Sequence, residues 1–258
     1  MRNQPDRPLS GRKILITGAS SGVGDHLARM LARQGAIVAC CARRIDRLDN
    51  LVAQISAEGG TALAVPCDVA DAKSISSAFQ FAEDRIGPID SVICNAGINH
   101  PGPAIKLSTE NLDAILSVNL RGAFLTAQEG ARRISSDEVP ESRRRIIFIS
   151  SILGTKPLAG AAIYGATKAG VILLAKTLAL EWSRRRITVN CICPGYMPTE
   201  IIDDWFETPG GKADMARWPR QDFMAVDRLD PALLFLLSEA AASTTGNAII
   251  VDEGQSLV

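Results

Sequence analysis

The sequence of 258 residues has no excess of either charge and is poor in histidine and aromatic residues. Lys plus Arg and Asp plus Glu both number 28, so the formal net charge is zero. A protein that neutralises a nucleic-acid backbone needs a basic excess, so we expect no nucleic-acid partner. Aromatic residues make up 5% of the chain, too few for a surface that stacks on bases or sugars. The two histidines, His26 and His100, lack metal-ligand spacing, so we expect no metal site and no Ser-His-Asp triad.

Long apolar runs and cysteine pairs are also lacking. No apolar stretch reaches the roughly 18 residues that a membrane-spanning helix needs, and residues 1–10 are too polar for a signal peptide. The six cysteines stand in apolar, strand-like segments without a C-x-x-C pair, and they are Cys40, Cys41, Cys67, Cys94, Cys191 and Cys193. We expect reduced, buried thiols rather than disulfides or zinc ligands. We therefore expect a cytoplasmic protein with no membrane partner.

Strand-like and helix-like segments alternate along the chain. Apolar runs predict strands at residues 12–17, 36–41, 61–66, 89–94, 145–150, 187–193 and 248–252. Helical spacing predicts helices at 23–34, 45–57, 72–86, 109–134, 161–184 and 232–238, with Asp230 as the cap of the last one and Pro231 in its first turn. Continuous apolar strands between helices imply a parallel sheet covered on both faces. The expected fold class is α/β, as a single doubly wound Rossmann-type domain over residues 1–258 with a parallel seven-stranded sheet.

A glycine-rich turn joins the first predicted strand to the first predicted helix. It reads Thr17-Gly18-Ala19-Ser20-Ser21-Gly22-Val23-Gly24, with the spacing G-x-x-x-G-x-G. Glycine lets the backbone approach a pyrophosphate closely, and the N-terminus of the helix stabilises its negative charge. An ordinary strand-to-helix turn could carry the same glycines. The position after the first strand favours a dinucleotide site, since ligands of such sheets bind beyond the carboxyl ends of the strands.

The residues after the second predicted strand bear on which dinucleotide is bound. An NAD site usually carries a carboxylate about 20 residues after the glycine-rich turn, where it binds the ribose hydroxyls. Here that position reads Cys41-Ala42-Arg43-Arg44. Guanidinium groups grip a 2′-phosphate, which a carboxylate would repel. We therefore expect NADP(H) in preference to NAD(H); the alternative is that Arg43 and Arg44 are merely solvated residues at the start of a helix.

Further short motifs follow the glycine-rich turn in a fixed order. They are Cys67-Asp68-Val69, Asn95-Ala96-Gly97, Val118-Asn119-Leu120, Ile149-Ser150-Ser151, Tyr164-Gly165-Ala166-Thr167-Lys168 and Pro194-Gly195. In their order and spacing, these motifs make the chain, from about Gly11 to its C-terminus, resemble the short-chain dehydrogenase/reductase family.

The resemblance implies a role for each matching residue. The catalytic set would be Asn119, Ser151, Tyr164 and Lys168. The cofactor set would be Gly18, Ser20, Ser21, Gly22, Val23, Gly24, Arg43, Arg44, Asp68, Val69, Asn95, Ala96, Gly97, Tyr164, Lys168, Pro194, Gly195, Met197 and Thr199, with Asp68 near the adenine and Pro194 near the nicotinamide. The long helices that contain Asn119 and Tyr164 resemble those that pair subunits in the family. We therefore expect a homotetramer, with a dimer as the second choice.

The chemistry of the implied catalytic set is consistent with proton transfer. Tyr164 and Lys168 are four residues apart, so they share one face of a helix. The ammonium group and a positive nicotinamide should lower the pKa of the phenol, which then exchanges a proton with an alcohol or ketone. Ser151 should hydrogen-bond the reacting oxygen, and Asn119 should hold a water for proton relay. Lys168 should also bind the ribose.

The resemblance predicts an enzyme that transfers a hydride between NADP(H) and a small alcohol or ketone. Two alternatives stay open. One is a 3-oxoacyl-acyl-carrier-protein reductase, and the other is a non-catalytic protein that senses the cofactor or has a structural role.

Some segments depart from the family pattern. Glu253 stands where relatives commonly carry glycine, and Arg184-Arg185-Arg186 precedes a strand without the usual glycine. If the backbone forces Arg186 to a positive φ, we expect local strain of about 1 kcal/mol. We expect this cluster and Arg143-Arg144-Arg145 to be solvated surface.

The loop insertion at about 196–226 should determine the choice of substrate. Five residues of it are candidates for an apolar lid, namely Trp205, Phe206, Met215, Trp218 and Phe223. The alternative is that these residues pack against a neighbouring subunit. We expect His100, Pro101 and residues 152–158 to form the opposite wall.

Overall fold

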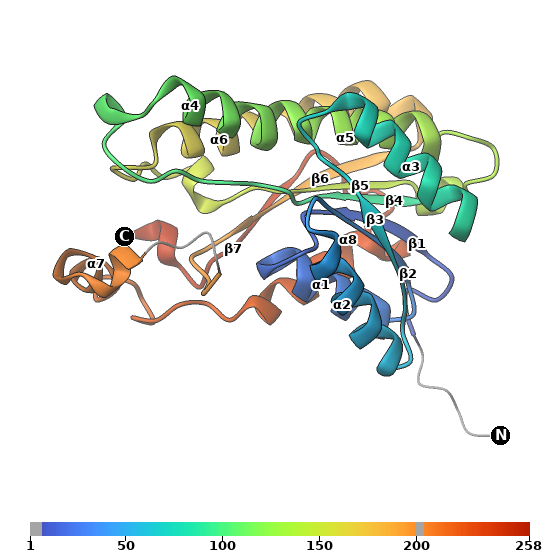
Figure 1. Ribbon diagram of the computed structural model, residues 1–258, viewed down its shortest axis with the longest axis horizontal. Coiled ribbons are helices and arrows are strands. Elements are labelled where there is room, and N and C mark those ends of the chain that lie inside the picture. The colour runs from blue at the N-terminus through green and yellow to red at the C-terminus, as the bar shows by residue number, and fades with distance from the viewer. Residues whose placement is uncertain (1–6, 200–203) are drawn as a thin grey trace.

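The structure is a computed structural model that describes residues 7–199 and 204–258, apart from the side chains of residues 204 and 205. At its centre is a seven-stranded sheet with the order β3-β2-β1-β4-β5-β6-β7 (Figure 1). The strands are β1 Lys13–Thr17, β2 Ile37–Ala42, β3 Thr61–Pro66, β4 Ser91–Cys94, β5 Arg145–Ile149, β6 Thr188–Pro194 and β7 Ala248–Val251. All neighbouring strands pair in parallel, which confirms the predicted sheet.

Helices cover both faces of the sheet (Figure 1). One face is covered by α1 Gly22–Arg33, α2 Ile45–Ala57 and α8 Asp230–Leu237, and the other by α3 Ala72–Ile86, α5 Ala123–Ile134 and α6 Ala162–Trp182. The helix α4 Thr109–Leu116 contacts α6, and α7 Pro209–Met215 lies apart, near the C-terminus (Figure 1). Short 3₁₀ turns span Ala104–Lys106, Glu141–Arg143, Ile152–Gly154, Ser183–Arg185, Asp204–Glu207, Val226–Leu229, Glu239–Ala241 and Gln255–Leu257.

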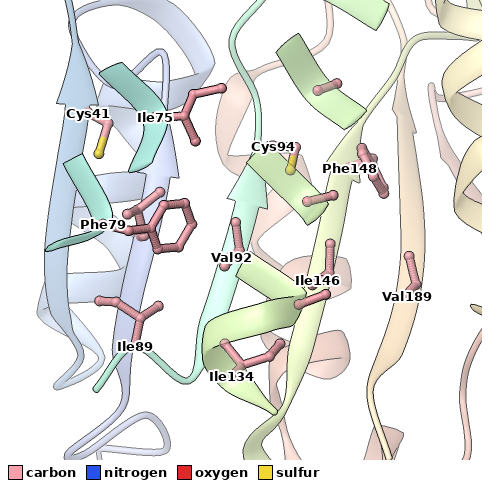
Figure 2. Packing of buried hydrophobic residues seen from close by; sticks show 14 of the residues in the cluster. Cys41, Ile75, Phe79, Ile89, Val92, Cys94, Ile134, Ile146, Phe148 and Val189 are labelled. Atoms are coloured by element: carbon pink, nitrogen blue, oxygen red, sulfur yellow. The ribbon is translucent and has the colours of Figure 1, made fainter. Parts of the chain in front are cut away.

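The core lies on both sides of the sheet because successive strand residues point to opposite faces. In β1, Leu15 belongs to the cluster under α3 and α5, whereas Ile14 and Ile16 belong to the cluster under α1 and α2. Figure 2 shows the first cluster, in which Phe79 and Val92 lie close together. Burial of both faces explains why the strands are continuous apolar runs rather than alternating ones.

The cysteines are part of this core, as predicted. All six are free and buried, and Cys41 and Cys94 point into the cluster of Figure 2. Burial raises the pKa of Cys40 to about 12 and that of Cys67 to about 11. These two thiols therefore stay protonated at neutral pH, as inert core groups do.

Two predictions about helices need correction. The helix predicted at 109–134 contains a π turn at Ser117–Gly122, which accommodates a locally wider helix turn between α4 and α5. Asp230 is not a cap but the first residue of α8, which follows the 3₁₀ turn that ends at Leu229. Its carboxylate instead lies 2.8 Å from Nε2 of His26 on α1. Both features depend on tertiary contacts, which local spacing does not reveal.

The helix α6 with the turn after it, Ala162–Arg185, is long and apolar enough to cross a membrane by length and composition alone. One face of α6, which includes Val171, Ala175 and Leu178, is buried in the core cluster. It packs against β6 and, to the same extent, against the 3₁₀ turn Ile152–Gly154. In this fold the segment is a core helix of the sheet.

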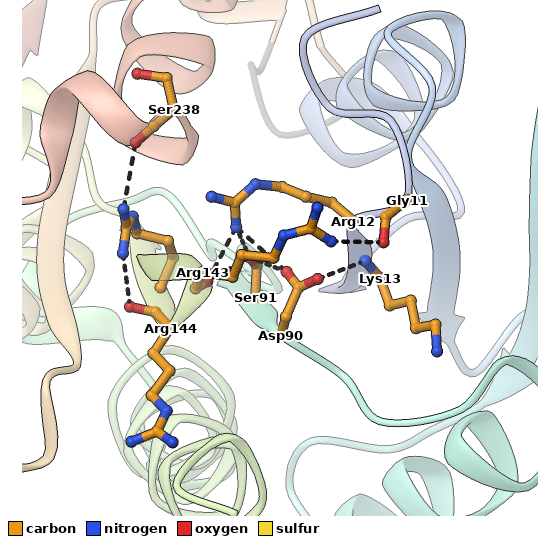
Figure 3. A network of polar contacts seen from close by, with 9 residues as sticks. Gly11, Arg12, Lys13, Asp90, Ser91, Arg143, Arg144 and Ser238 are labelled. Carbon is orange, nitrogen blue, oxygen red and sulfur yellow. Dashed lines mark hydrogen bonds and ion pairs between the residues drawn. The ribbon is translucent and has the colours of Figure 1, made fainter. Parts of the chain in front are cut away.

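The amino ends of the strands hold a network of buried arginines (Figure 3). Nη1 of Arg12 donates to Asp90 at 3.3 Å and to Ser91 at 3.0 Å. Arg145 is 1% exposed and donates to the carbonyls of Arg144 and Ser238, and burial lowers its pKa to about 10. The prediction that Arg143-Arg144-Arg145 is solvated surface is therefore wrong for Arg144 and Arg145. Their guanidinium groups bond to main-chain oxygens, some nearby and two in distant segments, namely those of Arg185 and Ser238.

The departures from the family pattern have backbone consequences. Arg186 has φ 56° and Glu253 has φ 50°, so both occupy the left-handed region that glycine adopts most easily. The condition for strain at Arg186 is therefore met, and residues 184–186 are exposed as predicted.

Candidate active site

A cavity of about 1020 Å³ opens at the carboxyl ends of the strands. A cavity at the upper end of the usual range for ligand pockets has room for a large cofactor together with a small molecule. Every residue of the predicted cofactor set lines it, as do Ser151, Tyr164 and Lys168 of the catalytic set. Asn119 is not among the lining residues. The sequence therefore predicted most of the wall of one cavity.

The glycine-rich turn is held against the end of β4. Gly18 has φ +72°, and a Cβ there would lie 2.8 Å from Cα of Ala96. A Cβ on Gly24 would collide with the carbonyl oxygen of Gly18. Oγ1 of Thr17 accepts hydrogen bonds from the main-chain N–H groups of Asn95 (3.1 Å) and Ala96 (3.2 Å), which ties the two strand ends together. Only glycine permits this close approach.

The N-terminus of α1 is open to an anion. Its cap residue, Ser21, makes no side-chain hydrogen bond to the first turn, so the N–H groups there keep their capacity to bind. Nη2 of Arg44 donates to Oγ of Ser21 at 2.7 Å, and Nε of Arg44 donates to Oγ of Ser20 at 3.1 Å. Arg43 is exposed and lines the same cavity. This rim of hydroxyl, guanidinium and N–H donors suits phosphate groups.

Tyr164 and Lys168 lie on α6 beside the end of β5. Nζ of Lys168 lies 5.5 Å from the centre of the Tyr164 ring and donates a hydrogen bond to the carbonyl of Ile149 at 2.9 Å. Ser151 follows β5, and its Oγ accepts the N–H of Leu153 at 3.1 Å. The side chain of Ser151 is near enough to the phenol of Tyr164 to lower its pKa. The predicted hydroxyl, phenol and ammonium groups are thus brought together.

Burial dominates the proton affinities at this site. Burial raises the pKa of Tyr164 to about 12, and the side chain of Ser151 opposes that rise. Burial also lowers the pKa of Lys168 to about 8, because the charged form loses its hydration. The predicted lowering of the phenol pKa by the ammonium group is therefore wrong for the protein groups alone. At neutral pH they leave Tyr164 protonated.

Asn119 lies in the π turn and supports the site from behind. Its side chain is buried, with Oδ1 accepting the N–H of Ile98 and Nδ2 donating to the carbonyl of Ile98, both at 2.8 Å. A Cβ on Gly97 would lie 3.6 Å from Oδ1 of Asn119 and 3.5 Å from Nζ of Lys168. Asn119 therefore holds the loop after β4 against Lys168.

Gln255 is a contributor that the sequence did not reveal. Its side chain is buried, and Oε1 accepts the N–H of Tyr196 at 2.7 Å while Nε2 donates to the carbonyl of Asp222 at 3.3 Å. A Cβ on Gly195 would collide with the same Oε1. This glutamine joins the C-terminal turn to the turn after β6 and to the lid. A single glutamine near a chain end carries no recognisable signal.

The lid is only partly as predicted. Phe206 lines the cavity together with Tyr196, while Trp218 stacks on Tyr196 with ring centres 4.8 Å apart. Phe223 packs edge-on against Phe206. Met215 belongs to the same cluster, so Met215, Trp218 and Phe223 support the lining rather than form it; the side chain of Trp205 lies outside the described residues.

The opposite wall also differs in part from the prediction. Pro101, Leu153 and Leu158 line the cavity as expected. His100 is exposed and lines a separate, much smaller pocket. The wall that faces the lid is therefore apolar.

Comparisons with known proteins agree with this geometry. The short chain dehydrogenase family model matches residues 12–210. Gluconate 5-dehydrogenase of Gluconobacter oxydans is 34% identical over 257 residues, with 95% of each chain covered. The 3-oxoacyl-acyl-carrier-protein reductase of Synechocystis is 33% identical over 249 residues, covering 95% of this chain and 97% of the relative.

A solved structure extends the agreement to the fold. The crystal structure of a gluconate 5-dehydrogenase from Burkholderia cenocepacia, in complex with NADP and tartrate, has a TM-score of 0.91 at 31% identity and covers 98% of both chains. The family match includes the glycine-rich turn, the β5 end and the helix of Tyr164. The chain therefore belongs to the short-chain dehydrogenase/reductase family of oxidoreductases.

Proposed function

We propose that this chain is an NADP(H)-dependent enzyme that transfers a hydride to or from the carbon of an alcohol or ketone, within a single domain. The observation that carries the proposal is that Arg44 and Tyr164 line the same cavity, so a dinucleotide seated on the phosphate rim would reach the phenol. When bound, the nicotinamide supplies or takes up the hydride and, in its oxidised form, adds a positive charge.

The residues of the chain transfer the proton and position the substrate and the cofactor. Tyr164 donates a proton to the carbonyl oxygen during reduction, a role that suits a phenol protonated at neutral pH. Ser151 hydrogen-bonds the same oxygen, and the ammonium group of Lys168 holds the ribose. In the direction of oxidation the positive nicotinamide has to offset the burial that raises the pKa of Tyr164.

The sharpest test is Tyr164→Phe, which removes only the hydroxyl. We expect turnover to fall by about 10³–10⁴-fold, the range typical of a lost general acid or base. NADPH affinity, measured by fluorescence titration, and the melting temperature should stay close to those of the parent protein. Retained turnover in a folded Tyr164→Phe protein would reject the assignment.

The preference for NADP(H) rests on the contacts of Arg44 with Ser20 and Ser21 and on the exposure of Arg43 at the rim. Arg44→Ala should weaken NADPH binding by about tenfold or more and leave NADH binding unchanged, because a charge-assisted phosphate contact is lost. Arg33→Ala is the matched control, since this exposed arginine pairs with Glu58 away from the cavity. Tighter binding of NADH than NADPH by the parent protein would contradict the preference.

Reduction of an acyl-carrier thioester is the second candidate, because a relative of 33% identity has that name. An assay with an acetoacetyl thioester and NADPH distinguishes it from reduction of small ketones. The presence of both Tyr164 and Lys168 at the cavity disfavours a non-catalytic role.

A homotetramer remains our proposal for the assembly, with a dimer as the second choice, in the cytoplasm and without a membrane partner. Leu173 and Leu180, two turns apart on α6, are 66% and 80% exposed, and Ile250 is exposed on the edge strand β7. These exposed apolar residues lie at two separate places, and two kinds of subunit contact need two such places. Sedimentation showing only monomer at micromolar concentration would overturn the proposal.

A further inference from the structure

The cavity has two parts of different chemistry. The cofactor part contains the charged lining residues Arg43, Arg44, Asp68 and Lys168. The part beyond Tyr164, here called the substrate chamber, is walled among the described residues mainly by apolar groups, namely Pro101, Pro103, Leu153, Leu158, Tyr196 and Phe206. The boundary between the two parts lies at the phenol that exchanges the proton.

The aromatic side of the substrate chamber is rigid. The rings of Tyr196 and Phe206 meet edge-to-face, with centres 5.1 Å apart, and Trp218 stacks behind Tyr196. The main chain of Tyr196 is fixed on both sides, because Gln255 accepts its N–H and its carbonyl accepts the N–H of Met224. A fixed corner of two rings offers faces and edges against which a flat hydrocarbon group packs well.

Charges next to the substrate chamber do not favour an anion. Lys156 follows the wall residue Leu153, but its ammonium group donates to the carbonyl of Gln255 and to the last residue, Val258. Burial and, after it, the negative charge of Asp214 raise the pKa of Tyr196 to about 12. A carboxylate therefore acts on the ring that lines the substrate chamber. An anionic substrate would lose hydration here without a compensating cation on the described walls.

We propose that the substrate is an uncharged ketone, or the matching secondary alcohol, with a bulky hydrocarbon group such as an aryl ring beside the reacting carbon. The inference rests on the proposed function. In the reduction, the hydride from NADPH bonds to the carbonyl carbon and the proton from Tyr164 bonds to the oxygen, which yields the alcohol and NADP⁺. This preference separates the chain from a relative whose crystal structure contains tartrate, a dicarboxylate.

A matched pair of ketones tests the proposal. Methyl 4-acetylbenzoate and 4-acetylbenzoate share the ring and the carbonyl group, and only the second carries a negative charge. With NADPH, we expect kcat/KM for the ester to exceed that for the acid at least tenfold. Equal values, or a higher value for the acid, would overturn the inference.

A charge added to the wall provides the second measurement. Ala159 lines the cavity and is exposed, so Ala159→Lys introduces a cation without filling the core. This variant should reduce the ester-to-acid ratio at least fivefold, whereas Ala159→Gln, of similar size and without charge, should not. A ratio that Ala159→Lys leaves unchanged would show that wall charge does not set the selectivity, and the inference would fail.

Binding separates this inference from the proposed function. If NADPH binds but neither ketone is turned over, the proposed function loses its support. The affinity of each ketone for the NADPH complex, read from quenching of NADPH fluorescence, still decides the inference. Tighter binding of the ester supports an apolar substrate chamber, and tighter binding of the acid refutes it.

Discussion

At the amino ends of the strands, buried charged groups bond to other protein groups, whereas at the carboxyl ends they border a cavity. Arg12 and Asp90 bond to each other (Figure 3), and Arg145 bonds to the carbonyl of Ser238, although its Nε has no partner. Lys168 is comparably buried, yet it lines an open space next to Tyr164. Burial of charge therefore does not by itself identify an active site. What distinguishes the carboxyl end is buried charge beside a cavity and a helix N-terminus.

The direction of the chain accounts for this difference. In a parallel sheet each strand leads at its carboxyl end into a loop and then the N-terminus of a helix, so N–H donors gather there. At the amino ends the chain arrives from the C-termini of helices, where carbonyl groups are in excess. Arginine donors satisfy such carbonyls, as Arg144 does with Val139 and Arg185.

The largest test of this comparison is Asp90→Ala at the amino end. It leaves the guanidinium of Arg12 buried without its carboxylate, and breaking such a pair costs about 3–5 kcal/mol of unfolding free energy. Urea denaturation measures that loss, while NADPH affinity of the folded protein should not change. Asp90→Asn keeps an acceptor for the N–H of Lys13 and should cost less. A large change in NADPH affinity would show that the two ends are not independent.

The next effect concerns Gln255 at the carboxyl end. Gln255→Ala leaves the buried N–H of Tyr196 without an acceptor, which costs about 1–3 kcal/mol of stability. The substrate chamber should lose order, so KM for the ketone should rise more than the Kd for NADPH. Gln255→Glu is the matched variant, because it keeps the acceptor for Tyr196 but sets a carboxylate against the carbonyl of Asp222. An unchanged KM in both variants would remove Gln255 from the site.

A pH series sharpens the comparison further. Lys168 has its pKa lowered to about 8, so its positive charge is lost as the pH rises through that value. If binding of the ribose needs the cation, NADPH affinity should fall roughly eightfold between about pH 7.5 and pH 9. Lys168→Arg should flatten this profile, since a guanidinium group stays protonated.

Stability should respond to Lys168 in the opposite direction. The unfolded chain binds this proton more tightly, with the ordinary lysine pKa of 10.5. The contribution of Lys168 to the unfolding free energy therefore rises as the pH increases from about 8 towards 10.5. If the unfolding free energy instead fell over this pH range, and Lys168→Arg abolished that fall, the lowered pKa would be contradicted.

The smallest expected effect concerns Arg186, which belongs neither to the arginine network at the amino ends of the strands nor to the cavity at their carboxyl ends. Arg186→Gly relieves a positive φ at an exposed position and should raise the unfolding free energy by about 0.5–1 kcal/mol. Glu253→Gly relieves a similar φ but removes an ion pair with Arg220, so its gain should be smaller. Thermal unfolding compares the two variants. Equal or lower stability of Arg186→Gly would mean that its left-handed backbone carries no strain.

Sequence reasoning predicted the parts of the site that depend on one residue's chemistry. A glycine such as Gly18 is required where a Cβ would meet Ala96, and Tyr164 and Lys168 share a helix face, so both can be recognised locally. Gln255 could not be recognised, because its partner Tyr196 lies 59 residues away. The burial of Arg145 was missed for the same reason, since it depends on Ser238 in another segment. Periodicity likewise located the helix at 109–134 but not its π turn.

The strand order has a consequence for how the protein comes into being on the ribosome. The first three strands are neighbours in both sequence and space, and they can pair as soon as they are made. The next neighbour of β1 is β4, and the glycine-rich turn is secured only when Asn95 reaches Thr17, 78 residues away. A growing chain therefore cannot secure the glycine-rich turn until Asn95 has been made, and the loop that must then close slows this step of folding.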